Sequence, residues 1–239
     1  MRALGALGSL VARPDGADPA VRVVRQVASR CLAYPDAQLI GWLPSLRSAL
    51  AEQGVRELES FLDFLQTTPL RDLERHYVEV FDISRRHALY LSYWTDGDTR
   101  RRGEVLAQFK AVYRASGFLV DTAGELPDFL PMVLEFAAVA DPVAGDRLLR
   151  DYRPSLELLR IGLVEDGTPY AAVLTAVCGT LPGPSPADRA AVQAMAGPPP
   201  TESVGLEPYD PRLLPLAGQD SAGHDMAGQD LARQGGRTL

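Results

Sequence analysis

Apolar side chains recur at helical spacing along most of the chain between Asp18 and Leu181. A helix brings every third or fourth residue onto one face, so such spacing predicts amphipathic helices. The first stripe follows the pair Asp18-Pro19 and consists of Val21, Val24, Ala28, Cys31 and Leu32. Aspartate favours the N-cap position and proline the first helical position. A helix is therefore predicted to begin at Asp18-Pro19.

Further stripes predict a series of helices, with apolar faces within 39–50, 55–65, 70–81, 105–113, 130–137, 148–163 and 170–177. The segment 84–94 is apolar and aromatic, and a helix is expected there as well. Pro44 should kink or break its helix and Pro154 should bend another, because proline removes a backbone donor and clashes with the preceding turn. Thr68-Pro69 and Thr168-Pro169 resemble helix starts.

The fold class follows from this pattern. No segment combines the alternation and turn residues that strands require. The sequence therefore predicts an all-α protein, with a compact helical domain of about nine or ten helices joined by short loops.

Composition divides the chain into three parts. We expect a flexible N-terminus over 1–17, a helical domain over 18–181, and a Pro/Gly-rich tail over 182–239. A short alanine-rich helix lies early in the tail, between the sequences PGPSP and GPPP. The rest is rich in Gly, Asp and Gln, and repeats AGQD, so we expect it to be mostly disordered.

Charge and cysteine content limit the possible partners. The 239 residues carry a formal charge of −7. Nucleic-acid binding depends on neutralising phosphates, so this charge suits a basic peptide better. Cys31 and Cys178 lie in apolar helical patterns, which predicts buried free thiols and a reducing, cytoplasmic compartment. Prolines and glycines interrupt the uncharged stretch 167–187, and no membrane span is expected.

Motifs for catalysis and metal binding are missing from the sequence. Leu73 and Ser84 stand three residues before His76 and His87, where a di-iron bundle would carry glutamates. There is no HExxH, CxxC, GxSxG, GxGxxG or phosphate-binding loop. We therefore expect no enzymatic activity, no metal site and no cofactor of its own.

The segment 76–136 concentrates aromatic, acidic and arginine residues, which is typical of a binding groove. An amphipathic peptide helix binds by laying its apolar face in such a groove. Acids at the rim would attract basic residues of the peptide, and the candidates are Glu79, Asp82 and Asp128. Most arginines should form weak surface ion pairs. Arg86 and Arg102 are the candidates for holding the groove through bidentate carboxylate pairs.

Several short motifs, in order, carry a family resemblance: Tyr34-Pro35-Asp36, YVEVFD at 77–82, the stretch 86–91, GDTRRRGEVL at 97–106, YRASGF at 113–118, ELPDFLPMVLEF at 125–136 and VGLEPY at 204–209. With this order and spacing the chain resembles the NarJ-type assembly chaperones of respiratory nitrate reductase, also called the delta subunit. The resemblance covers roughly residues 20–180. One departure is Phe129, where many relatives have histidine, so a role that needs an imidazole at this position does not transfer.

The resemblance implies an all-helical cytoplasmic chaperone without catalytic activity. Such a protein binds the N-terminal segment of the catalytic (alpha) subunit of nitrate reductase and assists insertion of the molybdenum cofactor, which the client receives, before membrane anchoring. It implies contacts with cofactor-biosynthesis proteins as a further possibility, and none with nucleic acid. By position, the residues expected to bind the client are Tyr77, Phe81, Asp82, Arg86, Asp98, Arg102, Pro127, Asp128 and Glu135.

Three other interpretations remain open. The client could be another molybdoenzyme with an intact twin-arginine leader. A DNA-binding regulator could use the cluster Arg100–Arg102, although the net charge disfavours it. An enzyme would need a nucleophile–base pair or a metal set that the motifs do not provide.

Overall fold

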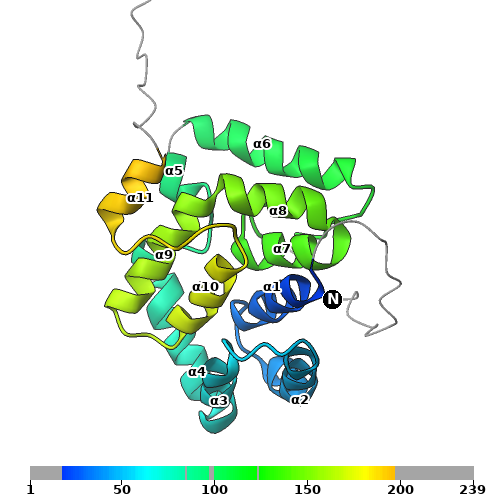
Figure 1. Cartoon of the computed structure of the whole chain (residues 1–239), viewed down its shortest axis with the longest axis vertical. Helices are drawn as coiled ribbons and strands as arrows, with labels where there is room; N and C mark the ends of the chain where they lie inside the picture. Colours follow the sequence, from blue (N-terminus) through cyan, green and yellow to red (C-terminus); the bar gives the residue numbers. More distant parts are fainter. Residues whose placement is uncertain (1–17, 84, 97–99, 123, 197–239) are drawn as a thin grey trace, which may run out of the picture. The chain divides into compact units, whose positions relative to one another are not determined.

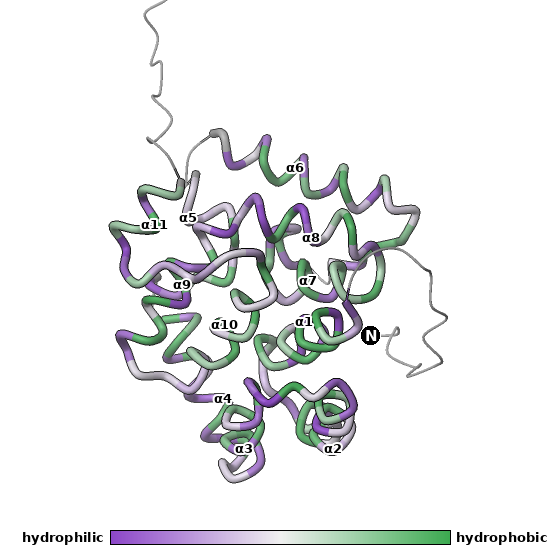
Figure 2. The backbone as a smooth tube through the Cα atoms, in the orientation of Figure 1, coloured by the Kyte–Doolittle hydropathy of each residue, from purple (hydrophilic) through white to green (hydrophobic). Residues whose placement is uncertain are grey.

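Helix α1 (Pro19–Cys31) is the central element of the fold, with α2, α7, α10 and the π-helix η3 packed around it (Figure 1). The computed structural model describes residues 18–83, 85–96, 100–122 and 124–196. Hydrophobic positions of α1, α7 and α10 meet in the interior (Figure 2). Three of the four apolar residues Val24, Val27, Ala28 and Cys31 on α1 are at most 1% exposed, and Val24 is 7% exposed.

The remaining helices are α2 (Ala37–Glu52), α3 (Glu59–Thr67), α4 (Leu70–Tyr77), α5 (Tyr93–Asp96), α6 (Arg100–Ala115), α7 (Leu130–Glu135), α8 (Pro142–Asp151), α9 (Arg153–Glu165), α10 (Tyr170–Gly179) and α11 (Arg189–Ala196). Two π-helices, η1 (Val78–Asp82) and η3 (Phe136–Ala140), directly continue α4 and α7, and η2 (Arg85–His87) is a 3-10 turn. The described chain has no named strand, which confirms the all-α class.

Aspartate caps set several of the helix starts. The side chain of Asp18 accepts from the Ala20 amide at 2.9 Å, which confirms the predicted start of α1. Asp36 accepts from Leu39 at 2.8 Å. Each cap satisfies an amide that has no partner within its helix. At the threonine-proline pairs, the N-caps of α4 and α10 are Pro69 and Pro169, and neither proline makes a side-chain cap bond. The hydroxyl of Thr168 nevertheless accepts from the amide of Tyr170, the first residue of α10, at 3.3 Å.

The structure bears on two expectations about proline. Helix α2 runs through Pro44 as one helix instead of breaking there. Pro44 is exposed, and the helix is anchored on both sides of it by the buried Leu39 and Leu50. The segment around Pro154 is divided rather than bent: α8 ends at Asp151 and α9 begins at Arg153, which places Pro154 in the first turn of a new helix, where proline is tolerated.

The helix expected over 84–94 is wrong for most of its length. After η2 the chain leaves the helical conformation, Tyr90 forms an isolated antiparallel bridge with Phe129, and a turn at residues 91–92 leads into α5. The amide of Leu91 donates to the Asp128 carbonyl at 3.1 Å, and the amide of Leu130 donates to the Leu89 carbonyl at 2.7 Å. Partners nearly forty residues away thus replace the local bonds of a helix.

The described fold continues past residue 181 to α11, which packs against α9. Arg153 and Arg160 of α9 hold the connecting segment by donating to the carbonyls of Pro182 and Pro186, respectively. The buried carboxylate of Glu157 lies beside both guanidinium groups. Across the described ranges, no helix is long and apolar enough to span a bilayer.

Candidate functional site

Tyr77, the last residue of α4, is the centre of a cluster of aromatic and acidic residues. Its side chain is buried, and its hydroxyl donates to the Leu32 carbonyl at 3.1 Å. Burial raises the pKa of Tyr77, and the nearby groups Asp82, Glu125 and Tyr90 raise it further. The hydrogen bond to Leu32, 45 positions earlier, shows that segments distant in the sequence meet at Tyr77.

We call this cluster the Tyr77 face; it comprises Tyr34, Tyr77, Phe81, Asp82, Tyr90 and Glu125. The ring of Tyr77 lies edge-on to Tyr34 at a centroid distance of 5.4 Å and 4.9 Å from the ring of Phe81. Phe81 in turn lies 4.7 Å from the buried ring of Tyr170 on α10. The floor of the face is therefore a rigid, interlocked set of aromatic rings.

The edge of the face combines exposed apolar and acidic groups. Tyr34 is 51% exposed, although it contacts the buried ring of Tyr77. Asp82 and Glu125 are both exposed. Next to them in sequence stand Ile83, which is 74% exposed, and Leu126, which is 39% exposed. An exposed apolar edge bearing two carboxylates suits an amphipathic partner with basic residues.

Tyr90 links the face to the loop before α7. Its hydroxyl donates to Glu125 at 2.6 Å, and its ring lies 5.5 Å from that of Phe129. Burial and this bond to Glu125 raise the pKa of Tyr90. The guanidinium of Arg102 lies 6.0 Å from the Tyr90 ring and 5.9 Å from the Tyr93 ring, within the range of cation–π attraction. Arg102 thus binds aromatic rings in addition to any carboxylate.

Pro127 and Asp128 lie beneath the surface. The Pro127 carbonyl accepts from the Tyr113 hydroxyl at 2.6 Å. Asp128 has no exposed surface, and one carboxylate oxygen accepts from both the amide and the hydroxyl of Ser92. The position expected for Asp128 at the rim is therefore wrong, because this carboxylate holds two buried segments together.

The other predicted residues lie on different parts of the fold. Glu135 pairs with Arg30 of α1 at 2.5 Å. Arg86 lies 3.4 Å from Asp166, in the turn after α9. Asp98 falls outside the residues that the structure describes. The structure thus brings Tyr77 and Phe81 together next to Asp82, buries Pro127 and Asp128 in the loop before α7, and places Arg102 beside Tyr90 and Tyr93.

Sequence reasoning did not assign three members of the face, Tyr34, Tyr90 and Glu125. Each had a local signal. Tyr34 precedes a proline outside the helices, Tyr90 stands in a segment that lacks helix caps, and Glu125 opens the ELPDF motif. No local signal shows that the three converge, because they are separated by up to 91 positions.

In the part of the chain that the structure describes, no group of three His, Cys, Asp or Glu side chains could hold a metal ion. Cys31 and Cys178 are both free and buried.

The fold has a counterpart among solved structures. It matches a crystal structure from Archaeoglobus fulgidus, described as a candidate redox enzyme maturation protein, with a TM-score of 0.54 and 21% identity. The match covers 72% of this chain and 97% of the other. The likeness establishes a shared all-helical fold.

Sequence comparison adds the family. Residues 48–176 match the family model of the nitrate reductase delta subunit. The NarJ protein of Bacillus subtilis strain 168 is 34% identical over 154 residues, which cover 63% of this chain and 83% of the relative. The chain therefore belongs to the nitrate reductase delta subunit family.

Two further relatives carry informative names. The nitrate reductase molybdenum cofactor assembly chaperone NarJ of Escherichia coli K12 is 31% identical, covering 62% of this chain and 64% of the relative. The nitrate reductase-like protein NarX of Mycobacterium tuberculosis H37Rv is 40% identical over 158 residues. That alignment covers 66% of this chain but spans only 24% of NarX.

Proposed function

We propose that the protein is a cytoplasmic assembly chaperone that binds the N-terminal segment of the catalytic subunit of nitrate reductase. In this proposal it assists molybdenum cofactor insertion and maturation before the client reaches the membrane. Membership of the delta subunit family, with relatives named as cofactor assembly chaperones, supports the role. We infer that the protein acts without catalysing a reaction and without a cofactor of its own.

The observation that carries the binding site is the combination of a buried aromatic floor and an exposed acidic edge at the Tyr77 face. Affinity in helix-in-groove complexes comes from a few apolar anchors. Tyr34 and Ile83 offer exposed apolar surface for such anchors. Asp82 and Glu125 supply negative charge that steers a basic peptide and makes binding depend on salt. The π-helix η1 presents Phe81 and Asp82 side by side in sequence, and π-turns of this kind recur at functional sites.

Binding a flexible N-terminal segment would act on the client by population shift. A chaperone changes its client's conformation only by binding one state more tightly than another. Holding the segment away from the enzyme would favour an open state that accepts the cofactor. It would also delay docking to the membrane partner until the segment is released.

The test is calorimetric titration with a synthetic peptide of the N-terminus of the catalytic subunit from the same genome. We expect one-to-one binding that Asp82→Asn and Glu125→Gln together weaken about tenfold, a typical loss of one to two kcal/mol. The matched control is Glu52→Gln. It removes an exposed carboxylate at the far end of α2, about 20 Å along the helix from the Tyr34 end.

Two outcomes would contradict the proposal. Equal losses in the Glu52 control and in the double variant would show that the face is not the site. If the protein ignored this peptide but bound an intact twin-arginine leader of another molybdoenzyme, the client would be a different enzyme.

A further inference from the structure

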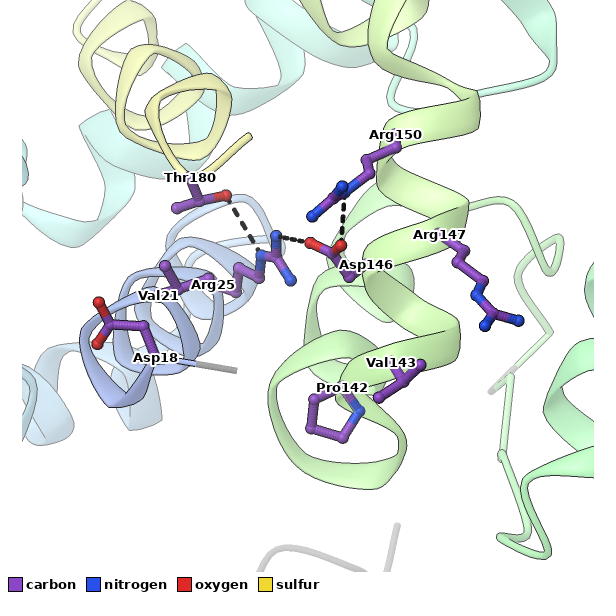
Figure 3. A pocket seen from close by; sticks show the side chains of 9 residues that line it. All are labelled: Asp18, Val21, Arg25, Pro142, Val143, Asp146, Arg147, Arg150 and Thr180. Carbon is purple, nitrogen blue, oxygen red and sulfur yellow. Dashed lines mark hydrogen bonds and ion pairs between the residues drawn. The ribbon is translucent and has the colours of Figure 1, made fainter. Parts of the chain in front are cut away.

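A cavity of about 400 Å³ lies where the first turns of α1 and α8 approach the end of α10 (Figure 3). Its size falls in the range of pockets for small molecules. The lining residues come from these three helices and their ends: Asp18, Val21, Arg25, Pro142, Val143, Asp146, Arg147, Arg150 and Thr180. None of these residues belongs to the Tyr77 face.

One carboxylate in this cavity serves two guanidinium groups. Arg25 of α1 donates to one oxygen of Asp146 at 2.7 Å, and Arg150 lies 2.6 Å from the other oxygen. Figure 3 shows both arginines pointing toward Asp146 from different helices. Because a single negative charge faces two positive ones, one positive charge has no counterion in this trio.

Arg25 is unusual in its burial. Its side chain has no exposed surface, and its Nε donates to the hydroxyl of Thr180 at 3.2 Å. Its Nη1 is also buried but has no hydrogen-bond partner. A buried donor on a charged group that is left without an acceptor is costly, so this nitrogen favours an additional acceptor.

The rest of the lining adds to the positive character. Arg147 is exposed and has no ion pair among the described residues. In Figure 3 it points away from Asp146. The other acid, Asp18, already accepts from the Ala20 amide as the cap of α1. Three arginines therefore line the cavity together with only two carboxylates, and both carboxylates are already engaged.

We propose that this cavity is a binding site for a small phosphate monoester, and we call it the Arg25 pocket. Guanidinium groups bind phosphate through paired, charge-assisted hydrogen bonds. The Arg150 side chain is 55% exposed and can turn from Asp146 toward a ligand, which opens the path to Arg25. A bare phosphate would occupy only a small part of 400 Å³. The apolar groups Val21, Pro142 and Val143 form the remaining wall, against which an organic body can pack.

A purely structural role for the Arg25–Asp146 pair makes a different prediction. A buried ion pair of this kind can hold α1 against α8 without any ligand. An ion pair with only this structural role would not respond to added phosphate compounds. The two interpretations therefore differ in ligand binding, and they can be separated without measuring chaperone activity.

The experiment titrates the purified full chain with phenyl phosphate and, separately, with inorganic phosphate. Calorimetry and the arginine Nε–Hε signals in NMR are the two readouts. We expect saturable binding of phenyl phosphate, tighter than that of inorganic phosphate, with the Nε–Hε signals of Arg25 and Arg150 shifting together. Arg150→Gln should weaken binding about tenfold, the loss of one good charge-assisted contact.

The matched control is Arg71→Gln, which removes the same charge from an exposed position on α4. Arg25→Met would remove a buried ion pair and is expected to destabilise the fold, so Arg150→Gln is the deciding variant. Failure of the wild-type chain to bind phenyl phosphate, or equal losses in the Arg150 and Arg71 variants, would overturn the assignment. Equal affinity for inorganic phosphate and for phenyl phosphate would overturn the proposal that the ligand carries an organic group.

Discussion

The carboxylate of Asp128 accepts two hydrogen bonds from a single residue, Ser92. The amide of Ser92 donates at 3.0 Å and its hydroxyl at 2.6 Å, both to the same oxygen. Both residues have no exposed surface. Because the chain between them contains α5 and α6, this contact fixes the loop before α7 to the turn between η2 and α5.

Asp128→Ala should therefore destabilise the fold. It leaves the buried amide and hydroxyl of Ser92 unpaired, and a loss of about 2–3 kcal/mol in the free energy of unfolding is expected. Urea unfolding measures this loss. Asp82→Ala is the control, because Asp82 is exposed and its removal should change stability by less than about 0.5 kcal/mol. Equal stability of the two variants would contradict the structural role of Asp128.

This contrast shows where sequence reasoning about the site reaches its limit. Asp82 and Asp128 both appear in the sequence as acids near aromatic residues, and both were natural candidates for a rim. Asp82 is indeed exposed, while Asp128 is buried by a partner 36 positions earlier. The local sequence pattern shows which residue types are present. Whether a carboxylate is exposed or buried depends on tertiary contacts that this pattern does not show.

His76 should make stability depend on pH. Its ring stacks on Tyr170 at 5.8 Å, and its Nε2 lies 3.3 Å from the hydroxyl of Thr168. Burial lowers the pKa of His76 below its ordinary value of 6.5, against a smaller opposing effect of Glu79. Between the lowered pKa and 6.5 the unfolded chain binds more protons than the folded chain. The contribution of the neutral His76 to stability should therefore be fully present above about pH 6.5, and it should be lost as the pH falls from there through the lowered pKa.

The measurement compares urea midpoints at about pH 7.5 and pH 5.5, on either side of the ordinary histidine pKa, for the wild-type chain and for His76→Gln. The midpoint of the wild-type chain should fall by more than that of the variant. Other titrating groups contribute equally to both proteins, so the difference between the two changes isolates His76. Identical changes would show that His76 does not couple protonation to folding.

Much of the helical pattern was predictable because it depends on local chemistry. The caps Asp18 and Asp36 accept hydrogen bonds from amides two or three residues away, so the starts of α1 and α2 follow from short sequences. The helix predicted over 84–94 is wrong for the opposite reason. Its backbone pairs with Asp128 and Leu130, and no local pattern identifies such distant partners.

The two cysteines should be inert in the folded protein. Burial raises the pKa of Cys31 to about 12, and burial also raises the pKa of Cys178, with the nearby Glu157 contributing. The thiolate is the reactive form, so neither residue should react with a water-soluble disulfide reagent near neutral pH. Both should react once the protein is unfolded in urea. Rapid reaction of the native protein would show that α1 or α10 opens readily.

Gly145 of α8 lies so close to η3 that no side chain fits. A Cβ added at Gly145 would lie 2.3 Å from the Cα of Ala137, which is a backbone atom and cannot move aside without shifting the helix. Gly145→Ala should therefore separate α8 from η3 and lower the free energy of unfolding by about 1–3 kcal/mol or more.

Gly41→Ala in α2 is the matched control, since a Cβ there meets no atom within 4 Å. Alanine also has the higher helix propensity, so Gly41→Ala should stabilise the protein by up to about 1 kcal/mol. Urea unfolding of the two variants should give effects of opposite sign. A neutral Gly145→Ala variant would mean that the approach of α8 to η3 is looser than the structure shows.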